Sequence, residues 1–146
     1  MFRVARKMVG DSDVAADIVQ DVFISLFDKL DTGIVILHLN SWLYRATLNK
    51  CVDDARRQKR FRTIESLKDY RIEEPADNQE TAAIINQALS RLKPNEKSIV
   101  VLYSEGLSYK EIAEAAGVRF SSVGKTLQRT LEKLGEELKD QHDELY

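Results

Sequence analysis

Residues 108–127 read SYKEIAEAAGVRFSSVGKTL, and this stretch decides the fold expected for the second half of the chain. Ser108 and Glu111 have the spacing of a capping box, in which each side chain binds the other residue's backbone N–H at the start of a helix. Ala113, Gly117 and Val123 follow four and six residues apart. A small residue lets two helices approach, a glycine accepts the tight turn, and a branched apolar residue seats the second helix. The stretch therefore predicts a helix-turn-helix, whose second helix enters the major groove of DNA.

Polar side chains crowd the first turns of this expected second helix, which is the part that faces base edges. Arginine can bind guanine through two hydrogen bonds and glutamine can bind adenine, whereas serine and threonine bind phosphates or either base. A plain helical hairpin with a polar face is the alternative, but the capping box and the spacing favour DNA binding. The candidate DNA-binding residues are Arg119, Ser121, Ser122, Lys125, Thr126, Gln128 and Arg129.

The rest of the chain also predicts helices, so the expected fold class is all-α. The 146 residues are 43% hydrophobic and 32% charged, and 2 Pro and 6 Gly leave little room for the turns of a β-sandwich. Apolar residues recur at three- and four-residue steps, with Phe23 and Phe27 expected to widen one buried stripe. The pattern predicts helices at 2–9, 12–31, 41–60, 81–92, 94–103, 108–116 and 121–138. Ser41 is expected to cap the third, after an apolar loop at 33–40 packed on the helices.

Composition excludes several classes of function. No apolar run approaches the ~18 residues of a membrane span and no signal peptide precedes the first charges, so we expect no membrane insertion. The single cysteine, Cys51, indicates a reducing, cytoplasmic setting, and His38 and His142 do not complete a metal site with it. Paired carboxylates near a base, a phosphate-binding glycine loop and a nucleophile constellation are lacking. We therefore expect no enzyme, no catalytic residue and no cofactor.

Positive charge is concentrated in one block of the chain. The net charge is −2, yet residues 45–62 hold seven basic and two acidic residues, a net of +5, so the remainder carries −7. Residues 65–80 then hold six acidic and two basic residues and include Pro75, which predicts a linker. A basic block inside an acidic protein indicates a directed electrostatic surface for nucleic acid, with an ordinary solvated helix face as the alternative.

The helix expected at 41–60 carries an indole beside cations. Arg45, Asn49, Arg56 and Arg60 project onto one side of this helix, and Trp42 lies on the same side at its start. Tyr44, Leu48, Cys51 and Ala55 form a separate stripe that is expected to pack. Aromatic rings stack on unpaired bases while cations hold the backbone, so the set suits single-stranded nucleic acid. The alternative for Trp42 is simple burial against the preceding loop.

A third segment, DIVQDVF at 17–23, places polar and acidic residues opposite an apolar stripe. Asp17, Gln20 and Asp21 project away from Val19 and Val22. Such a strip suits a basic partner surface, and taken alone it equally suits a solvated helix face.

In their order along the chain, these segments resemble the extracytoplasmic-function sigma factors of bacterial RNA polymerase, which belong to the sigma-70 family. Gly10-Asp11 and ADIVQDVF at 16–23 are similar to that family's region 2, as is WLYR at 42–45 with Asn49 and Asp53 before a basic run. LKP at 92–94, LSY at 107–109 and EIA at 111–113 are similar to its region 4. The resemblance covers nearly the whole chain.

The resemblance implies two small helical domains joined by a flexible linker. A region 2-like helical bundle would span 1–62, the linker 63–79, a region 4-like helix-turn-helix domain 80–140 and a tail 141–146. The acidic linker would run toward the RNA exit path of the polymerase and mimic nucleic acid. The family normally has about two more helical turns before the position of Phe2, so this domain is expected to lack them.

The resemblance also implies a function, that of a transcription initiation factor. Such a factor binds core RNA polymerase, directs it to promoter DNA through the −10 and −35 elements, and assists melting. An anti-sigma factor is a further candidate partner. The polymerase-binding residues would be Asp17, Gln20, Asp21 and Phe23. The −10 contacts would be Trp42, Arg45, Asn49, Arg56, Arg57 and Arg60, and the helix from Ser121 would contact the −35 element.

The sequence departs from the family pattern at two positions and leaves two other classes open. The loop at 33–39 is apolar where polar, base-contacting residues are expected, and Gly124 stands where a basic residue is frequent. A stand-alone helix-turn-helix regulator would bind operator duplex tightly without polymerase. A helical interaction module without a nucleic-acid role would tolerate charge reversal at Arg56 and Arg57.

Overall fold

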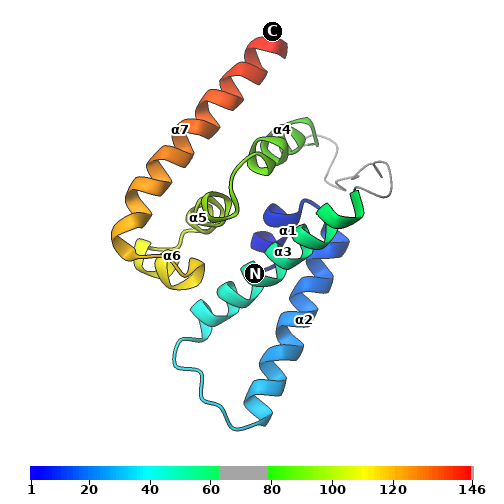
Figure 1. Ribbon diagram of the computed structural model, residues 1–146, viewed down its shortest axis with the longest axis vertical. Helices are drawn as coiled ribbons and strands as arrows, with labels where there is room; N and C mark the ends of the chain where they lie inside the picture. The colour runs from blue at the N-terminus through cyan, green and yellow to red at the C-terminus, as the bar shows by residue number, and fades with distance from the viewer. Residues whose placement is uncertain (63–78, 146) are drawn as a thin grey trace. The chain divides into compact units, whose positions relative to one another are not determined.

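The computed structural model describes residues 1–62 and 79–145, and all regular structure within these ranges is α-helical (Figure 1). The chain divides into two compact units, Met1–Arg71 and Ile72–Tyr146, which we call the N-terminal and the C-terminal unit. The predicted linker at 63–79 lies outside the described residues except for its last position. The all-α class predicted from the sequence is confirmed.

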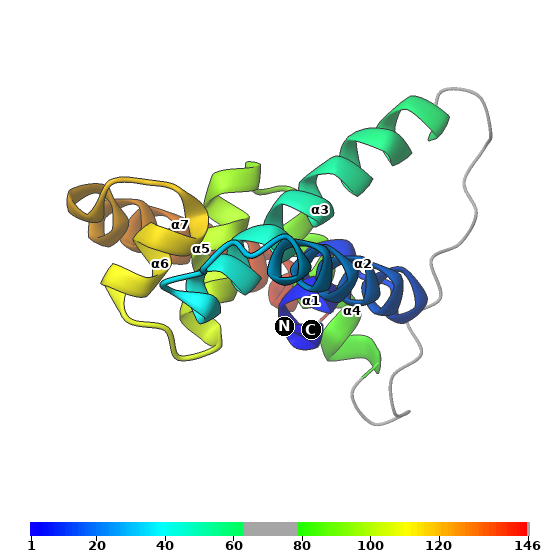
Figure 2. The same ribbon diagram turned by 90° about the horizontal axis from the view of Figure 1, so that it is seen from below.

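Three helices that contact one another form the N-terminal unit: α1 (Phe2–Val9), α2 (Ser12–Asp31) and α3 (Leu39–Arg62) (Figure 2). All three contribute to one small core. Thr47 is the polar member of this core, and its hydroxyl donates to the Leu43 carbonyl at 2.8 Å, so no polar group is left unsatisfied there. The buried side chains are Val4, Ala5, Met8, Ala15, Ile18, Val22, Thr47, Leu48 and Cys51.

The turn between α1 and α2 is specified locally. Gly10 ends α1 in the left-handed region at φ 75°, which glycine adopts without strain. Asp11 then caps α2, because its carboxylate accepts hydrogen bonds from the N–H groups of Asp13 at 2.8 Å and Val14 at 3.2 Å. These bonds fix the point at which α2 leaves α1.

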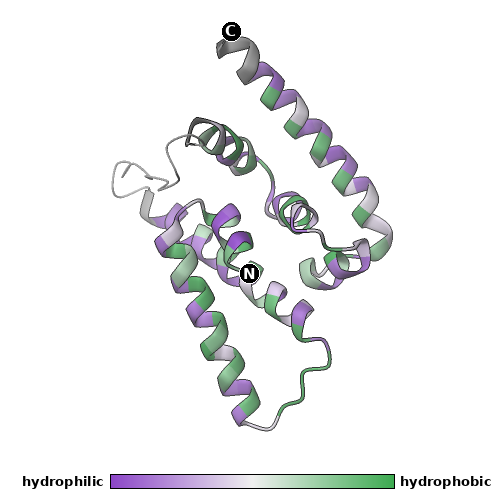
Figure 3. Cartoon of the chain, turned by 180° about the vertical axis from the view of Figure 1, so that it is seen from behind, coloured by the Kyte–Doolittle hydropathy of each residue, from purple (hydrophilic) through white to green (hydrophobic). Residues whose placement is uncertain are grey.

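The second half of α2 and the loop after it are exposed, where the sequence predicted burial. Phe23 and Phe27 do not widen the buried stripe, since they are 51% and 70% exposed. The apolar loop before α3 does not pack on the helices either, with Val35 80% and Leu37 85% exposed. Figure 3 shows this loop as a continuous hydrophobic stretch at the end of the N-terminal unit. The reason is geometric, because the short α1 contacts only part of the long α2.

The start of α3 also differs from the prediction. The helix begins at Leu39 rather than after Ser41, and the Trp42 N–H donates to the His38 carbonyl at 3.0 Å. Ser41 therefore lies inside the first turn and is not the cap. The helix runs two residues beyond the predicted end, to Arg62.

Four helices form the C-terminal unit: α4 (Gln79–Ser90), α5 (Pro94–Ser104), α6 (Tyr109–Ala116) and α7 (Phe120–Leu145). The last helix contacts each of the other three, so its inner side is the centre of the core. Pro94 occupies the first turn of α5, where its missing N–H costs nothing. The buried apolar residues are Ala88, Leu89, Ile99, Val100, Val101, Leu102, Ile112, Ala113, Ala115, Val123 and Leu127.

The last helix is longer than predicted. The sequence indicated an end near Leu138 and a frayed tail, whereas α7 continues to Leu145. Residues 139–145 contain neither glycine nor proline, so nothing in this stretch stops a helix that is already formed.

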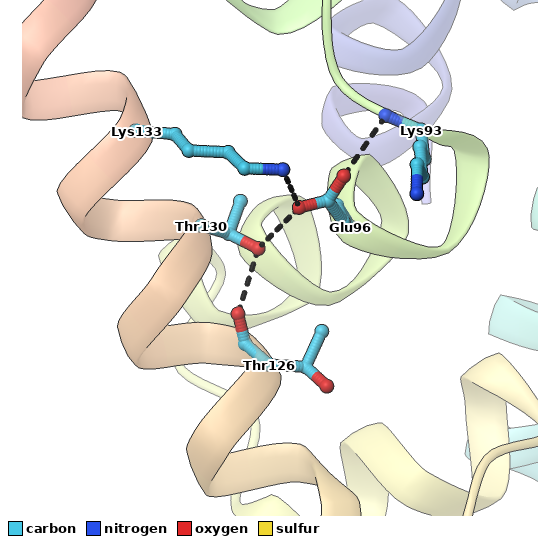
Figure 4. A network of polar contacts seen from close by, with 5 residues as sticks. All are labelled: Lys93, Glu96, Thr126, Thr130 and Lys133. Atoms are coloured by element: carbon cyan, nitrogen blue, oxygen red, sulfur yellow. Dashed lines mark hydrogen bonds and ion pairs between the residues drawn. The ribbon is translucent and has the colours of Figure 1, made fainter.

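A polar network joins the start of α5 to the middle of α7 (Figure 4). Glu96 accepts a hydrogen bond from the Lys93 backbone N–H at 3.3 Å and one from Lys133 Nζ at 2.9 Å. The hydroxyl of buried Thr130 donates to the Thr126 carbonyl at 2.7 Å and lies 3.4 Å from the same carboxylate. The hydrogen bond from Lys133 is the main reason that the pKa of Glu96 lies below its ordinary value of 4.5.

We predict that this network makes the C-terminal unit sensitive to acid. A carboxyl group with a lowered pKa in the folded state contributes stability above its ordinary value of 4.5, and the contribution is lost as the pH falls below 4.5. Glu96→Gln should therefore reduce the amide hydrogen-exchange protection of α5 and α7 at neutral pH, by up to about 1 kcal/mol, because the Lys133 side chain is 56% exposed and water screens the pair. The difference from the wild-type chain should shrink below pH 4.5.

The control for this measurement is Glu132→Gln, which removes an exposed carboxylate from α7, the helix that carries Lys133. Its protection should match the wild type at every pH. A Glu96→Gln deficit that is equally large at acid and neutral pH would contradict the assignment to the charged network.

Candidate nucleic-acid interface

The helix-turn-helix is built from α6 and the first half of α7. The capping box at the start of α6 is present as predicted, with the Ser108 N–H donating to Glu111 at 3.0 Å and the Glu111 N–H donating to the Ser108 hydroxyl at 3.2 Å. The bond from the Ser108 backbone lowers the pKa of Glu111. Gly117 ends α6 in the left-handed region at φ 69°. Ala113 and Val123 are both buried, so the three-residue pattern marks the helix contact that the sequence predicted.

One side of α7 packs and the other is free to contact DNA. Val123, Leu127 and Thr130 recur at helical spacing and are buried against the other helices. Thr126 is half-buried, so it stands at the border between the two sides. The other six predicted DNA-binding residues of this helix-turn-helix are exposed: Arg119, Ser121, Ser122, Lys125, Gln128 and Arg129.

Gly124 lies at the edge of this exposed side and is half-buried. A Cβ atom added there would stand 3.6 Å from Cε2 of Tyr109, which is an ordinary van der Waals distance. The glycine costs about 1 kcal/mol of helix propensity relative to alanine. The packing of the unit does not demand a glycine here.

A groove of about 450 Å³ lies between α2 and α3 in the N-terminal unit. Three of the predicted −10 residues, Trp42, Arg45 and Asn49, line it from α3. Its volume lies in the usual range for a small-molecule site. The remaining lining residues are Ser25, Lys29, Ala46, Lys50 and Asp53.

Lys29 extends from α2 over the indole of Trp42. The Lys29 Nζ atom lies 5.3 Å from the centroid of the ring, which is cation–π geometry worth about 0.5–1 kcal/mol at an accessible site. The half-buried indole thus lines the groove from α3 with a cation of α2 over its ring. Sequence analysis missed Lys29 because it belongs to a different helix. Its spacing of four residues from Ser25 is the available signal, since both reach the groove from one side of α2.

The other predicted −10 residues lie farther along α3. Arg56, Arg57 and Arg60 are exposed and do not line the groove. Ala55, predicted to pack with Leu48 and Cys51, is exposed as well. The inner side of this part of the helix holds Asp54, whose pKa is raised by burial, and its carboxylate accepts from Gln58 at 3.3 Å. The basic side chains thus extend the charged surface beyond the groove without joining its lining.

The exposed side of α2 changes character along its length. Asp17, Gln20 and Asp21 are exposed in the first half, as predicted. Beyond them, Phe23 begins a run of exposed apolar residues that also contains Ile24, Phe27 and Leu30. We call the set from Asp17 to Leu30 the α2 face. It combines negative charge with exposed apolar area on one side of the helix.

Two negative findings concern only the part of the chain that the structure describes. Within residues 1–62 and 79–145, no helix combines the length and the apolar character needed to cross a membrane. In the same ranges, histidine, cysteine and acidic side chains nowhere gather in a group of three that could hold a metal ion.

Two family models match the chain, and together they cover it except for residues 62–81 and 135–146. The model described as Sigma-70 region 2 matches residues 1–61. The model described as Sigma-70, region 4 matches residues 82–134. The groove lies within the first match and the helix-turn-helix within the second.

Named relatives point to the same family. The chain is 30% identical to the RNA polymerase sigma-E factor of Streptomyces avermitilis, over 94% of this chain and 78% of that protein. It is 32% identical to the ECF RNA polymerase sigma factor SigE of Mycolicibacterium smegmatis, over 92% of this chain and 55% of that protein. The chain thus spans about half the length of the latter relative.

Solved structures share the fold. The sigma factor RpoE of Bartonella quintana, crystallised with the anti-sigma factor NepR, matches with a TM-score of 0.69 and 23% identity, over 94% of this chain and 89% of that one. CnrH, in complex with the cytosolic domain of CnrY, matches with a TM-score of 0.71 and 24% identity, over 95% and 80%. At these identities the likeness establishes the arrangement of helices.

We predict that the left-handed turn at Gly117 is required for the helix-turn-helix. An alanine at φ 69° would be strained, so Gly117→Ala should destabilise the C-terminal unit by about 1–2 kcal/mol. Gly135 lies within α7, and an added Cβ there would meet nothing within 4 Å. Gly135→Ala should therefore stabilise the unit by up to about 1 kcal/mol.

Denaturant unfolding of the full chain, followed by the helical circular dichroism signal, measures both variants. Opposite signs are expected from the same substitution at two positions of one unit. A Gly117→Ala variant as stable as the wild type or more stable would show that the backbone conformation at residue 117 does not fix the turn.

Proposed function

Because the chain belongs to the sigma-70 family of RNA polymerase sigma factors, with relatives of the extracytoplasmic-function type, we propose that it binds core RNA polymerase and directs it to specific promoters. The observation that carries this proposal is the distribution of the two family regions. Region 2 matches the unit that holds the groove with its indole, and region 4 matches the unit that holds the helix-turn-helix.

The α2 face is proposed to bind the polymerase. Asp17, Gln20 and Asp21 offer a charged and hydrogen-bonding surface, and Phe23 continues it with apolar area. Interface cores are enriched in aromatic side chains, whereas exposed aromatic clusters bring no stability to an isolated domain. The exposure of Phe23 and Phe27 on a well-formed helix supports a partner that covers them.

The groove is proposed to hold an unpaired base of the −10 element. One indole, two lysines and an arginine line it, and Asn49 and Asp53 supply hydrogen-bonding groups. Stacking on an aromatic ring contributes about 1–3 kcal/mol per base, and cations hold the backbone. Arg56, Arg57 and Arg60 continue the positive surface along α3, where the phosphates of the same strand would run.

The helix-turn-helix is proposed to bind the −35 element in the major groove. Arg119, Lys125 and Arg129 are the exposed cations, with Ser121, Ser122 and Gln128 as uncharged hydrogen-bonding groups. Thr126, at the border of the exposed side, would approach the backbone of the DNA.

Binding alone explains how such a chain would assist melting. A groove that accepts an unpaired base but not a paired one shifts the equilibrium toward the open duplex by its difference in affinity. The chain itself catalyses no reaction in this scheme and needs no cofactor. It acts in the cytoplasm, where its polymerase and promoter partners lie, and an anti-sigma factor of the kind bound by the two structural relatives is a further candidate partner.

The rival proposal is a stand-alone regulator, in which the helix-turn-helix binds an operator and the first domain serves dimerisation or sensing. It gives the groove and the basic side of α3 no part in binding nucleic acid. The initiation factor uses both, and we therefore favour it.

We predict that the chain co-elutes with bacterial core RNA polymerase on a sizing column and is displaced by a housekeeping sigma factor. Gln20→Ala combined with Asp21→Lys should abolish co-elution, because it removes a polar contact and reverses a charge on the α2 face. Both positions are exposed, so the helical circular dichroism signal and thermal unfolding should be unchanged.

Asp140→Lys makes the same charge reversal on an exposed position of α7 and serves as the control. It should co-elute like the wild type. Normal polymerase affinity of the Gln20/Asp21 variant would remove the α2 face from the interface. A wild-type chain that fails to co-elute yet binds duplex DNA tightly would favour the stand-alone regulator.

A second prediction concerns the groove. Trp42 is the only tryptophan, so its fluorescence reports on the groove directly. A short random-sequence single strand should quench this emission more than the corresponding duplex. Arg45→Gln should weaken the binding and reduce the slope of log K against log salt by about 0.7, the value for one lost cation on a single strand.

Lys139→Gln, which removes an exposed cation from α7, should leave the slope unchanged. Lys29→Met tests the cation over the indole, and it should lower the slope in the same way as Arg45→Gln. Binding without a change in Trp42 emission would place the strand outside the groove.

A further inference from the structure

An apolar edge borders the exposed polar side of the helix-turn-helix. Phe120 is the first residue of α7 and is 62% exposed. The two residues that follow it, Ser121 and Ser122, are exposed and polar. The sequence analysis did not assign Phe120 to the DNA-binding set. An aromatic ring with this exposure contributes little to the core, so its presence at the tip of the helix needs another explanation.

Gly124 and Tyr109 continue this edge. Gly124 follows Phe120 by four residues and therefore lies on the same side of α7, one turn further along. The ring of Tyr109, at the start of α6, stands 3.6 Å from the position that a Cβ of Gly124 would take, and it is 43% exposed. Because Gly124 has no side chain, no further side-chain atoms of α7 are added at this position beside the rings of Phe120 and Tyr109. We call Phe120, Gly124 and Tyr109 the aromatic edge.

The docking geometry of a helix-turn-helix places the first residues of its second helix at base edges in the major groove. The chemistry of that groove is almost wholly polar. Its one apolar feature is the C5-methyl group of thymine, which contacts apolar side chains including phenylalanine. The phosphate backbone offers no comparable partner, because each of its units carries a negative charge.

We propose that Phe120 contacts the methyl group of a thymine in the −35 element and thereby selects thymine at one position. The inference rests on the proposed function, since it takes the helix-turn-helix to bind the −35 element. Phe120 adds an apolar contact to the hydrogen bonds of Ser121, Lys125 and Gln128. Gly124, one turn further along, adds no side chain of its own beside the Phe120 ring.

The test compares thymine with deoxyuridine, which differs only in lacking the methyl group. Promoters are first selected from a random library with the chain bound to core polymerase. Each −35 thymine of the selected promoter, on either strand, is then replaced by deoxyuridine and the affinity of the complex is measured. Burial of one methyl group corresponds to about a fourfold effect, so one position should lose about that factor with the wild-type chain.

The same replacements are then measured with Phe120→Ala. This variant should bind the thymine promoter at least about fourfold more weakly than the wild-type chain does. It should no longer distinguish thymine from deoxyuridine at that position. Phe120→Leu should keep part of the discrimination. Tyr103→Ala removes an exposed aromatic ring from α5 and should discriminate like the wild type.

Three results would overturn the inference while leaving the proposed function in place: no methyl-sensitive position, undiminished discrimination by Phe120→Ala, or an equal loss by that variant on every sequence. The last would indicate a backbone contact. A selection that returns no −35 preference with the wild-type chain would instead count against the helix-turn-helix role itself. Because Phe120 is exposed, unfolding is not expected, and the circular dichroism spectrum of each variant checks it.

Discussion

Both candidate nucleic-acid surfaces depend on one constraint, which is that each is the outer side of a helix whose inner side is fixed in a core. Leu48 and Cys51 hold one side of α3, and Trp42, Arg45 and Asn49 emerge on the other. Val123 and Leu127 hold α7 in the same way. Helical geometry then determines which side chains face outward, because a rotation of the helix that exposed different residues would expose its apolar stripe.

Because of this constraint, each surface depends on the contacts that hold its helix in place. The indole of Trp42 is held from above by Lys29, a residue of another helix, so the groove keeps its shape only while α2 and α3 stay in register. In the C-terminal unit, the Glu96 network ties α7 to α5 through Lys133, one turn beyond Arg129 on α7. Sites held by packing and by supporting hydrogen bonds keep their geometry better than sites on loops.

The helix-turn-helix could be predicted from the sequence because its signals are local. A capping box and a left-handed glycine act within a few residues, and their hydrogen bonds form in the structure as the spacing indicates. The groove could be predicted only in part. Its α3 side follows from periodicity, but Lys29 enters by tertiary packing, which no spacing within α3 reveals. The exposure of Val35 and Leu37 was missed because hydropathy predicts burial without saying which surface does the burying.

The charge distribution of the chain bears on how it would bind DNA with and without the polymerase. Residues 45–62 carry a net charge of +5 while the remainder carries −7, so DNA approaching the groove meets attraction close by and repulsion from the rest. At physiological salt the repulsion is screened beyond about 8 Å, whereas the groove cations act at contact distance. We therefore expect the chain alone to bind duplex DNA weakly. We infer that a partner which brings DNA within reach of the groove raises the affinity of the chain for DNA more than an added cation would. Such dependence on a partner is what a promoter-specificity subunit requires.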